Sequence, residues 1–196
     1  MNSRPLLILL LLVSLLTIPR AICSPTEEAD NRLKKAVGEV VSIAAHAPDR
    51  KTLSEEVKPV LQGILSFETM TRRAIGPGWR QFTPAQQQEA TGLFTTLIIR
   101  TYTAKFTPGE LPTVTFKAPA SPSPGRVEVP TTSSYNGSSY DVVYRLEESE
   151  GWKITDVVIE GVSMIANYRT QFDAEFTQGG ANAVIKALNH SLSSSQ

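Results

Sequence analysis

Few side chains in this sequence are suited to acid–base or nucleophilic chemistry. Histidine is the residue type that normally titrates near neutral pH, and it occurs only twice in the sequence, as His46 and His190. His46 ends a predicted helix, and His190 lies close to the C-terminus. We therefore interpret both as exposed helix-end histidines. No HExxH, GxSxG or phosphate-binding glycine motif accompanies them.

Carboxylates are the remaining candidates for a general base. Asp141 and Asp156 fall on neighbouring predicted strands, and Glu160 follows the second of them. A small enzyme on a cone-shaped α+β fold, such as an isomerase, would use a carboxylate in this way, so that alternative stays open. The simpler interpretation is that both aspartates face water or pair with Arg145 and Lys153. We expect no catalytic residue and predict that the protein is not an enzyme.

Metal, cofactor and nucleic-acid sites are not expected either. Cys23 is the only cysteine, so the sequence offers neither a disulfide framework nor a thiolate metal site. The 19 basic residues are balanced by 19 acidic ones. Nucleic-acid binding normally requires a clustered basic face, and the sequence shows none.

The N-terminus has the order of a secretory signal peptide. Arg4 gives a positive start, Leu6–Leu16 is an almost unbroken apolar run, and Ala21 and Cys23 are small residues suited to a cleavage site. A membrane span needs about 20 apolar residues, so this run is short for one. A retained anchor helix is the alternative. Cleavage before Ser24 would leave a protein with two more acidic than basic residues and no lipid anchor.

Apolar residues at helical spacing predict helices on both sides of a block of strands. The clearest start is Thr83-Pro84-Ala85-Gln86, which combines an N-cap, a proline at the first helical position and a capping box. A break is expected at Gly179-Gly180. The predicted helices cover Leu33–Ala44, a segment capped by Thr52 or Ser54 and reaching Leu65, Phe67–Ile75, Pro84–Phe106, Val162–Phe176 and Ala181–Leu192.

The block between these helices predicts an antiparallel meander. Asn136-Gly137 is a hairpin turn, because both residues tolerate positive φ. The segment 118–125 contains three prolines and is predicted to be a loop. Helices on one face of a four-stranded antiparallel sheet give an α+β fold. The predicted strands are Val114–Phe116, Arg126–Ser133, Ser139–Glu147 and Trp152–Ile159.

Two stretches resemble the MlaC family, also called the toluene-tolerance or ABC-transporter auxiliary family. The first runs from Phe67 to Gln87 and contains Gly78-Trp79-Arg80. The second runs from Gly151 to Phe172 and contains Asp156 followed by Glu160-Gly161-Val162-Ser163. A hopanoid-associated branch of the family shares both stretches.

The resemblance implies a periplasmic carrier that moves phospholipids and maintains outer-membrane lipid asymmetry. Its implied partners are a phospholipid, an outer-membrane lipoprotein complex and the MCE-domain subunit of an inner-membrane ABC transporter. A carrier of hopanoids or other hydrophobic solutes and a protein-binding adaptor are the alternatives. The implied organisation is a signal peptide at 1–23, a single lipid-binding domain at 24–192 and a disordered tail at 193–196.

The resemblance also implies a curved sheet whose helices enclose an apolar lipid cavity. Each buried CH₂ contributes about 0.8 kcal/mol, so a diffuse apolar wall suffices to hold acyl chains. An apolar stripe is also what an ordinary core looks like, and the sequence does not separate the two. The predicted wall residues are Met70, Leu93, Leu97, Tyr102, Val142, Tyr144, Ile154 and Val158.

Overall fold

The structure is a computed structural model that describes residues 24–104, 107 and 109–194. The predicted signal peptide, residues 1–23, lies outside the described residues. Four α-helices and one 3₁₀ helix come first among the described residues, then six strands, then a long helix. None of the described helices is long and apolar enough to cross a membrane. The elements are α1 Pro25–His46, α2 Arg50–Ile64, α3 Phe67–Ile75, the 3₁₀ helix η1 Gly76–Gln81, α4 Pro84–Thr103, β1 Thr113–Phe116, β2 Ala120–Ser123, β3 Arg126–Tyr135, β4 Ser138–Ser149, β5 Gly151–Ile159, β6 Val162–Ser163 and α5 Met164–Ser194.

Side-chain caps fix where the helices begin. The capping box predicted for α4 is confirmed: the Gln86 N–H donates to Thr83 Oγ1 at 3.2 Å, and the Thr83 N–H donates to Gln86 Oε1 at 3.0 Å. Helix α2 begins earlier than predicted, because Asp49 accepts the Thr52 N–H at 2.8 Å and acts as the N-cap. Helix α1 also begins earlier, with Ser24 as its cap.

The sheet is antiparallel, with strand order β1-β3-β4-β5-β6, and β2 pairs with β3 beside this path. The predicted hairpin between β3 and β4 is confirmed, and Asn136 and Gly137 both have positive φ. The prediction of four strands is wrong, because the described chain contains six. The supposed loop 118–125 includes β2, where Pro122 is tolerated because the strand lies at the edge of the sheet.

A register shift between β4 and β5 changes which side chains share a face. Leu146 pairs with Ile154, but the preceding residue Arg145 pairs with Asp156, so Thr155 is an extra residue in β5. Such a bulge reverses the alternation of side chains beyond it. Residues of β5 on either side of Thr155 therefore do not follow one simple alternation.

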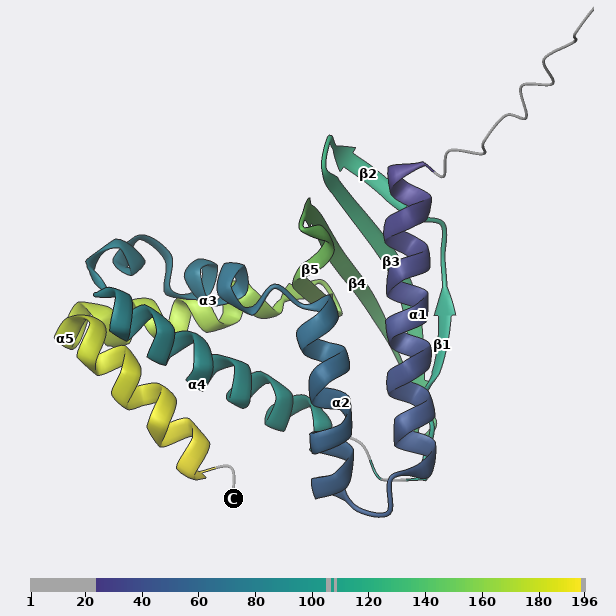
Figure 1. Cartoon of the computed structure of the whole chain (residues 1–196), viewed down its shortest axis with the longest axis horizontal. Coiled ribbons are helices and arrows are strands. Elements are labelled where there is room, and N and C mark those ends of the chain that lie inside the picture. The colour runs from purple at the N-terminus through teal and green to yellow at the C-terminus, as the bar shows by residue number, and fades with distance from the viewer. Residues whose placement is uncertain (1–23, 105–106, 108, 195–196) are drawn as a thin grey trace, which may run out of the picture.

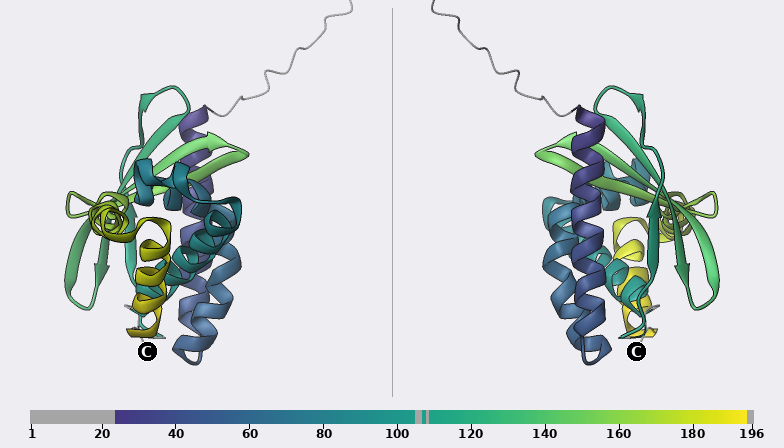
Figure 2. Two further views of the ribbon diagram at one scale, coloured as in Figure 1. Left: turned by 90° about the vertical axis from the view of Figure 1, so that its left-hand side faces the viewer. Right: turned by 90° about the vertical axis from the view of Figure 1, so that its right-hand side faces the viewer.

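The helices and the sheet enclose one core (Figures 1 and 2). Helix α1 runs along the sheet, and Lys34 Nζ lies 5.5 Å from the centre of the Phe116 ring on β1. Helices α3, α4 and α5 extend beside the β5 end of the sheet, where α3 and α5 contact β5. One hydrophobic core joins residues from all these helices and from the strands β3, β4 and β5.

Helix α5 is kinked where the sequence predicted a break. Gly179 and Gly180 have non-helical φ and ψ, and the second half of α5 returns along α4. The Gln86 side-chain amide donates to Asn182 Oδ1 at 2.9 Å, which joins the two helices. The helix begins at Met164 rather than at Val162, because Val162–Ser163 pairs with β5 as the short strand β6.

Candidate functional site

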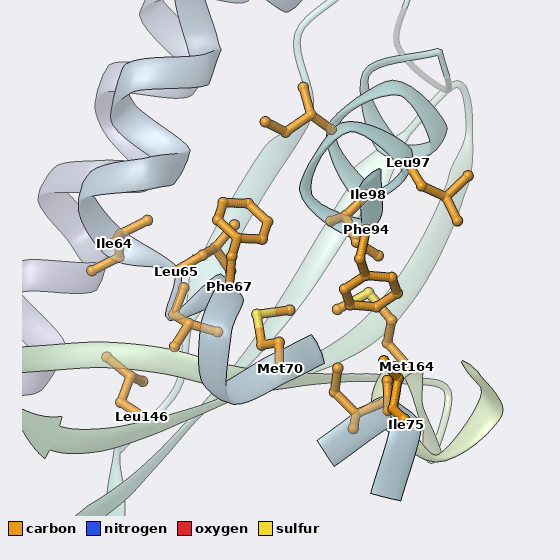
Figure 3. Close-up of a cluster of buried hydrophobic side chains, with 14 of the residues drawn as sticks. Ile64, Leu65, Phe67, Met70, Ile75, Phe94, Leu97, Ile98, Leu146 and Met164 are labelled. Carbon is orange, nitrogen blue, oxygen red and sulfur yellow. The ribbon is translucent and has the colours of Figure 1, made fainter. Parts of the chain in front are cut away.

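Six of the eight predicted wall residues meet in the main hydrophobic core. Met70, Leu97 and Ile154 are buried within it (Figure 3 shows Met70 and Leu97). Leu93, Tyr102 and Tyr144 are half-buried and pack against the same core. Helices α3 and α4 thus contribute four of these side chains, and strands β4 and β5 contribute two.

Val142 and Val158 are also buried, but neither belongs to the main core. Val142 lies on the face of β4 that carries Tyr144, and this face continues to Ile154 through the pairing of Leu146 with Ile154. Val158 pairs with Val143 and so lies on the other face of the sheet. The bulge at Thr155 causes this separation, which simple alternation along β5 does not predict.

Aromatic rings form a part of the interior that the predicted wall did not include. The rings of Phe94 and Tyr168 meet edge to face with centroids 5.0 Å apart, and Phe94 and Phe172 do so at 5.8 Å. Phe94 belongs to the apolar stripe of α4, and Tyr168 and Phe172 belong to the second family-like stretch. The helical spacing of apolar residues in α4 and the resemblance of the second stretch to the family were therefore the two sequence signals that could have identified these three aromatic residues.

Three tyrosines show how apolar this interior is. Burial raises the pKa of Tyr102 to about 12, with smaller contributions from Tyr168 and the Asp156 carboxylate. Burial also raises the pKa of Tyr144 and of Tyr168, although a hydrogen bond with Thr101 works in the opposite direction for Tyr168. Desolvation disfavours the phenolate, so all three hydroxyls stay neutral hydrogen-bond donors at physiological pH.

The predicted wall can be compared with two depressions of the described residues. Most of the predicted wall residues belong to one hydrophobic core or pack against it. A groove of about 440 Å³ runs along α4, and Leu93 is the predicted wall residue that lines it. None of the other predicted wall residues lines this groove or the second cavity. A second, polar cavity of about 570 Å³ has charged walls formed by Arg73, Arg126, Glu128, Arg145, Glu147 and Asp156.

Asp156 has a structural role at the junction between β5 and α5. It is only 8% exposed, so of the two expected arrangements, facing water or pairing with a basic residue, the pairing with Arg145 is the one observed. Arg145 Nη1 donates to Asp156 Oδ2 at 3.1 Å, as one of the two predicted pairings, and the Ser163 hydroxyl donates to the same oxygen at 2.7 Å. The Ile165 N–H donates to Asp156 Oδ1 at 3.2 Å. With both oxygens occupied, this carboxylate is poorly placed to act as a general base.

The turn between β5 and β6 explains the rest of the Asp156–Ser163 segment. Glu160 and Gly161 both have positive φ, which glycine adopts freely and other residues rarely do. The Glu160 carboxylate accepts the Asp141 N–H of the neighbouring strand. Asp141 itself is exposed, and hydrogen bonds from Lys117 and Thr132 hold the pKa of its carboxyl below the usual value.

The first family-like stretch packs against α5, both within the second stretch and just beyond it. A Cβ added to Gly78 would lie 2.9 Å from the Phe176 ring, and one added to Gly76 would lie 3.1 Å from the Arg169 guanidinium. The Gly76-Pro77-Gly78 turn therefore lets η1 approach α5 closely. These glycines end α3, as predicted, and also serve as the contact surface for α5.

The remaining candidates for chemistry lie apart from the core. His46 is exposed at the end of α1, where its Nδ1 lies 2.8 Å from the Ser42 carbonyl oxygen, and His190 is exposed near the end of α5. Lys153 does not pair with an aspartate; its Nζ donates to the Gly63 carbonyl oxygen. Within the part of the chain that the structure describes, no three His, Cys, Asp or Glu side chains are placed to hold a metal ion.

A sequence profile of the family described as "MlaC protein" matches residues 34–190. The chain belongs to the MlaC family. The matched range contains both packed stretches and every predicted wall residue, so the geometry described above is that of an MlaC protein.

Solved structures agree with this MlaC assignment. A phospholipid-binding protein from Ralstonia solanacearum, solved in complex with a phospholipid, has 28% sequence identity to the chain and a TM-score of 0.80. The alignment covers 86% of this chain and 98% of that protein. No protein with curated annotation matches the chain in sequence.

Proposed function

We propose that this MlaC-family protein is a periplasmic carrier that shuttles phospholipids between the outer membrane and an inner-membrane ABC transporter, and thereby maintains outer-membrane lipid asymmetry. The observation that carries the proposal is the likeness of nearly the whole fold to a protein solved with a bound phospholipid. The proposed partners are the phospholipid, the MCE-domain subunit of the transporter and an outer-membrane lipoprotein complex.

The chemistry of the interior suits this cargo. Met70, Leu97 and Ile154 offer an aliphatic wall without a charge, and the rings of Phe94 and Phe172 extend it. At about 0.8 kcal/mol for each buried CH₂, two acyl chains gain ample free energy from such surroundings. A carrier must also release its cargo, and a diffuse apolar wall holds acyl chains about as well as a bilayer does.

The placement of the described candidate bases suits a carrier. Asp156 is fully engaged at the start of α5, and the described histidines lie at helix ends. A carrier needs no group that transfers a proton. We therefore propose that lipid leaves the protein chemically unchanged.

The proposed organisation is one lipid-binding domain at residues 24–192 that follows a signal peptide at residues 1–23. A secretory signal peptide is removed in the mature protein. N-terminal sequencing of the protein from cells should find Ser24 or a close neighbour as the first residue. An acylated Cys23, or an intact Met1 in the membrane fraction, would contradict this part of the proposal.

Transfer of labelled phospholipid between donor and acceptor vesicles tests the function. The purified protein should raise the transfer rate in proportion to its concentration, and mass spectrometry should recover the lipid intact. A His46→Ala/His190→Ala variant should transfer lipid as fast as the wild type. Removal of a general base would instead slow a reaction by roughly 10²–10⁴. Hydrolysed or isomerised lipid would contradict the proposal, and vesicles that contain a hopanoid would reveal a preference for that cargo.

A further inference from the structure

The polar cavity beside the start of α5 is lined by three arginines and three carboxylates. Its volume is about 570 Å³, and its walls come from β2, β3, β4, β5, α3 and α5. Strand pairing places four of the six charged side chains on one face of the sheet, since Arg126 pairs with Glu147 and Glu128 pairs with Arg145. The six charges sum to zero, so the cavity as a whole favours neither an anion nor a cation.

The ion pairs divide these charges unequally between two ends of the cavity. At one end Glu147 is shared by two guanidinium groups: Arg73 Nη2 lies 2.7 Å from its Oε2, and Arg126 Nε lies 3.3 Å from its Oε1. This end therefore carries one positive charge in excess. The Arg126 side chain is 60% exposed, and a guanidinium has more N–H donors than this one contact uses. Donors thus remain for an oxyanion such as a phosphate.

The other end of the cavity has the opposite excess. Here Arg145 is shared by two carboxylates: its Nε lies 3.0 Å from Glu128 Oε1, and its Nη1 lies 3.1 Å from Asp156 Oδ2. Both oxygens of Asp156 are already engaged at the start of α5. The Glu128 side chain is 37% exposed, against 11% for Asp156. Glu128 is therefore the accessible acceptor for a cationic group.

A ligand that suits both ends must carry an anionic and a cationic group a short distance apart. Arg126 and Glu128 are separated by one residue on β3, which puts their Cα atoms roughly 7 Å apart on the same face. A phosphate joined to an ammonium by a two-carbon linker, as in phosphoethanolamine, suits this spacing. A headgroup that carries only the phosphate would gain at Arg126 and be repelled by Glu128.

The cavity also borders the apolar interior, because Val127, Leu146 and Ile165 line it and belong to the main core. We propose that this cavity binds the zwitterionic headgroup of a phospholipid, with the phosphate at Arg126 and the ammonium at Glu128. This inference rests on the proposed function, because it places the headgroup of the carried lipid beside the core that receives the acyl chains.

A competition between two headgroups tests the site. Vesicles would contain equal amounts of phosphatidylethanolamine and phosphatidylglycerol with identical acyl chains. Mass spectrometry of the lipids bound to the protein after incubation gives their ratio. The wild type should enrich phosphatidylethanolamine on the order of 2- to 5-fold, the range that one partly exposed ion pair provides.

Removal of the negative charge should remove this preference. Glu128→Gln keeps the shape of the side chain, cannot pair with an ammonium, and should bind both lipids equally. Glu148→Gln is the matched control: it makes the same change of charge on the neighbouring strand β4, at an exposed residue that does not line the cavity. The control should keep the wild-type ratio.

A soluble headgroup separates this site from the acyl-chain interior. Glycerophosphoethanolamine has no acyl chains, and its addition to the wild type should shift the NMR signals of the backbone amides around Arg126 and Arg145. Inorganic phosphate and ethanolamine, each added alone at the same concentration, should shift these signals less. Arg126→Gln should raise the dissociation constant of glycerophosphoethanolamine on the order of 2- to 5-fold.

The two experiments separate failure of the site from failure of the carrier function. Unmoved amide signals with glycerophosphoethanolamine, or equal shifts with phosphate alone, would overturn the zwitterion site. Uptake of both lipids without preference, or a preference that survives in folded Glu128→Gln, would overturn the assignment to a lipid headgroup while the carrier function stands. Uptake of neither lipid would contradict both proposals. The wild-type measurements decide the matter even if a variant does not fold.

Discussion

The hydroxyl of Ser163 lies 2.7 Å from the carboxylate of Asp156, and this contact joins strand β5 to the start of α5. Ser163 Oγ also accepts the Ala166 N–H at 3.0 Å, so it caps the helix. Asp156 adds a second bond to the same helix end through the Ile165 N–H. The two residues therefore place the N-terminus of α5 against the sheet, and α5 in turn supplies Phe172 to the core.

Replacement of Asp156 should destabilise the fold. Asp156→Ala removes hydrogen bonds from Arg145, Ser163 and the Ile165 N–H, and we expect the free energy of unfolding to fall by about 2–3 kcal/mol. Denaturant titration followed by circular dichroism measures this loss. Asp141→Ala is the matched control, because the Asp141 side chain is largely exposed, and its denaturation midpoint should stay close to that of the wild type. Equal midpoints for the two variants would contradict the role assigned to Asp156.

The contact between η1 and α5 can be tested at glycine positions. In Gly78→Ala the new methyl group meets the Phe176 ring, which is itself stacked on Phe82 with centroids 6.1 Å apart. We expect this overpacking to cost about 1–3 kcal/mol of stability. Gly92→Ala has open space around its Cβ within helix α4 and should gain about 0.5–1 kcal/mol. Thermal unfolding of both variants gives the comparison, and a stabilised Gly78→Ala would show that η1 and α5 are not in close contact.

A charge on the face of the sheet that carries Val142 and Tyr144 should prevent lipid binding. Val142 is buried on the face that carries Tyr144, and a carboxylate there would meet acyl chains at a cost of several kcal/mol. Val142→Asp should therefore reduce co-purified lipid by more than about tenfold, and Ile154→Lys should act in the same way. Val162→Asp is the control, since Val162 is 61% exposed, and it should retain its lipid. Folded variants of Val142 and Ile154 with undiminished lipid would show that the acyl chains lie elsewhere.

Stability at high pH should reflect the buried tyrosines. The pKa of Tyr102 is about 12 in the folded protein and near 10 when the chain is unfolded. Between these values the folded state retains a proton that the unfolded state has lost, so stability must fall as the pH rises from about 10 to 12. Thermal midpoints across this range should drop less in Tyr102→Phe than in the wild type. The same drop in both proteins would contradict the buried position of the hydroxyl.

Much of the fold follows from local sequence signals. The capping box at Thr83, the turn at Asn136-Gly137 and the break at Gly179-Gly180 act within a few residues of the chain, and all three are confirmed. The strand β2 was missed because its proline content reads as a loop, and only pairing with β3 makes it a strand. Contacts of that kind depend on the folded chain and leave no local pattern.

The residues of the apolar interior were predictable where they lie on helices, and less so where they lie on strands. Stripes of apolar residues identified Met70 and Leu97, because helical periodicity reports which side faces inward. The position of Val158 depends on the bulge at Thr155, which no spacing in the sequence reveals. Asp156 was expected to face water or to pair with a basic residue, and the pairing with Arg145 is observed, whereas its burial and its bond from Ser163 depend on other elements of the folded chain.

Native mass spectrometry of the protein purified without added lipid tests directly whether the protein carries a phospholipid. The spectrum should contain a species heavier than the polypeptide by the mass of a phospholipid, which collisional activation releases as an intact lipid. Val162→Asp should show the same adduct, and Val142→Asp should be free of it. A wild-type protein of polypeptide mass alone, which stays free of lipid after incubation with phospholipid vesicles, would contradict the account.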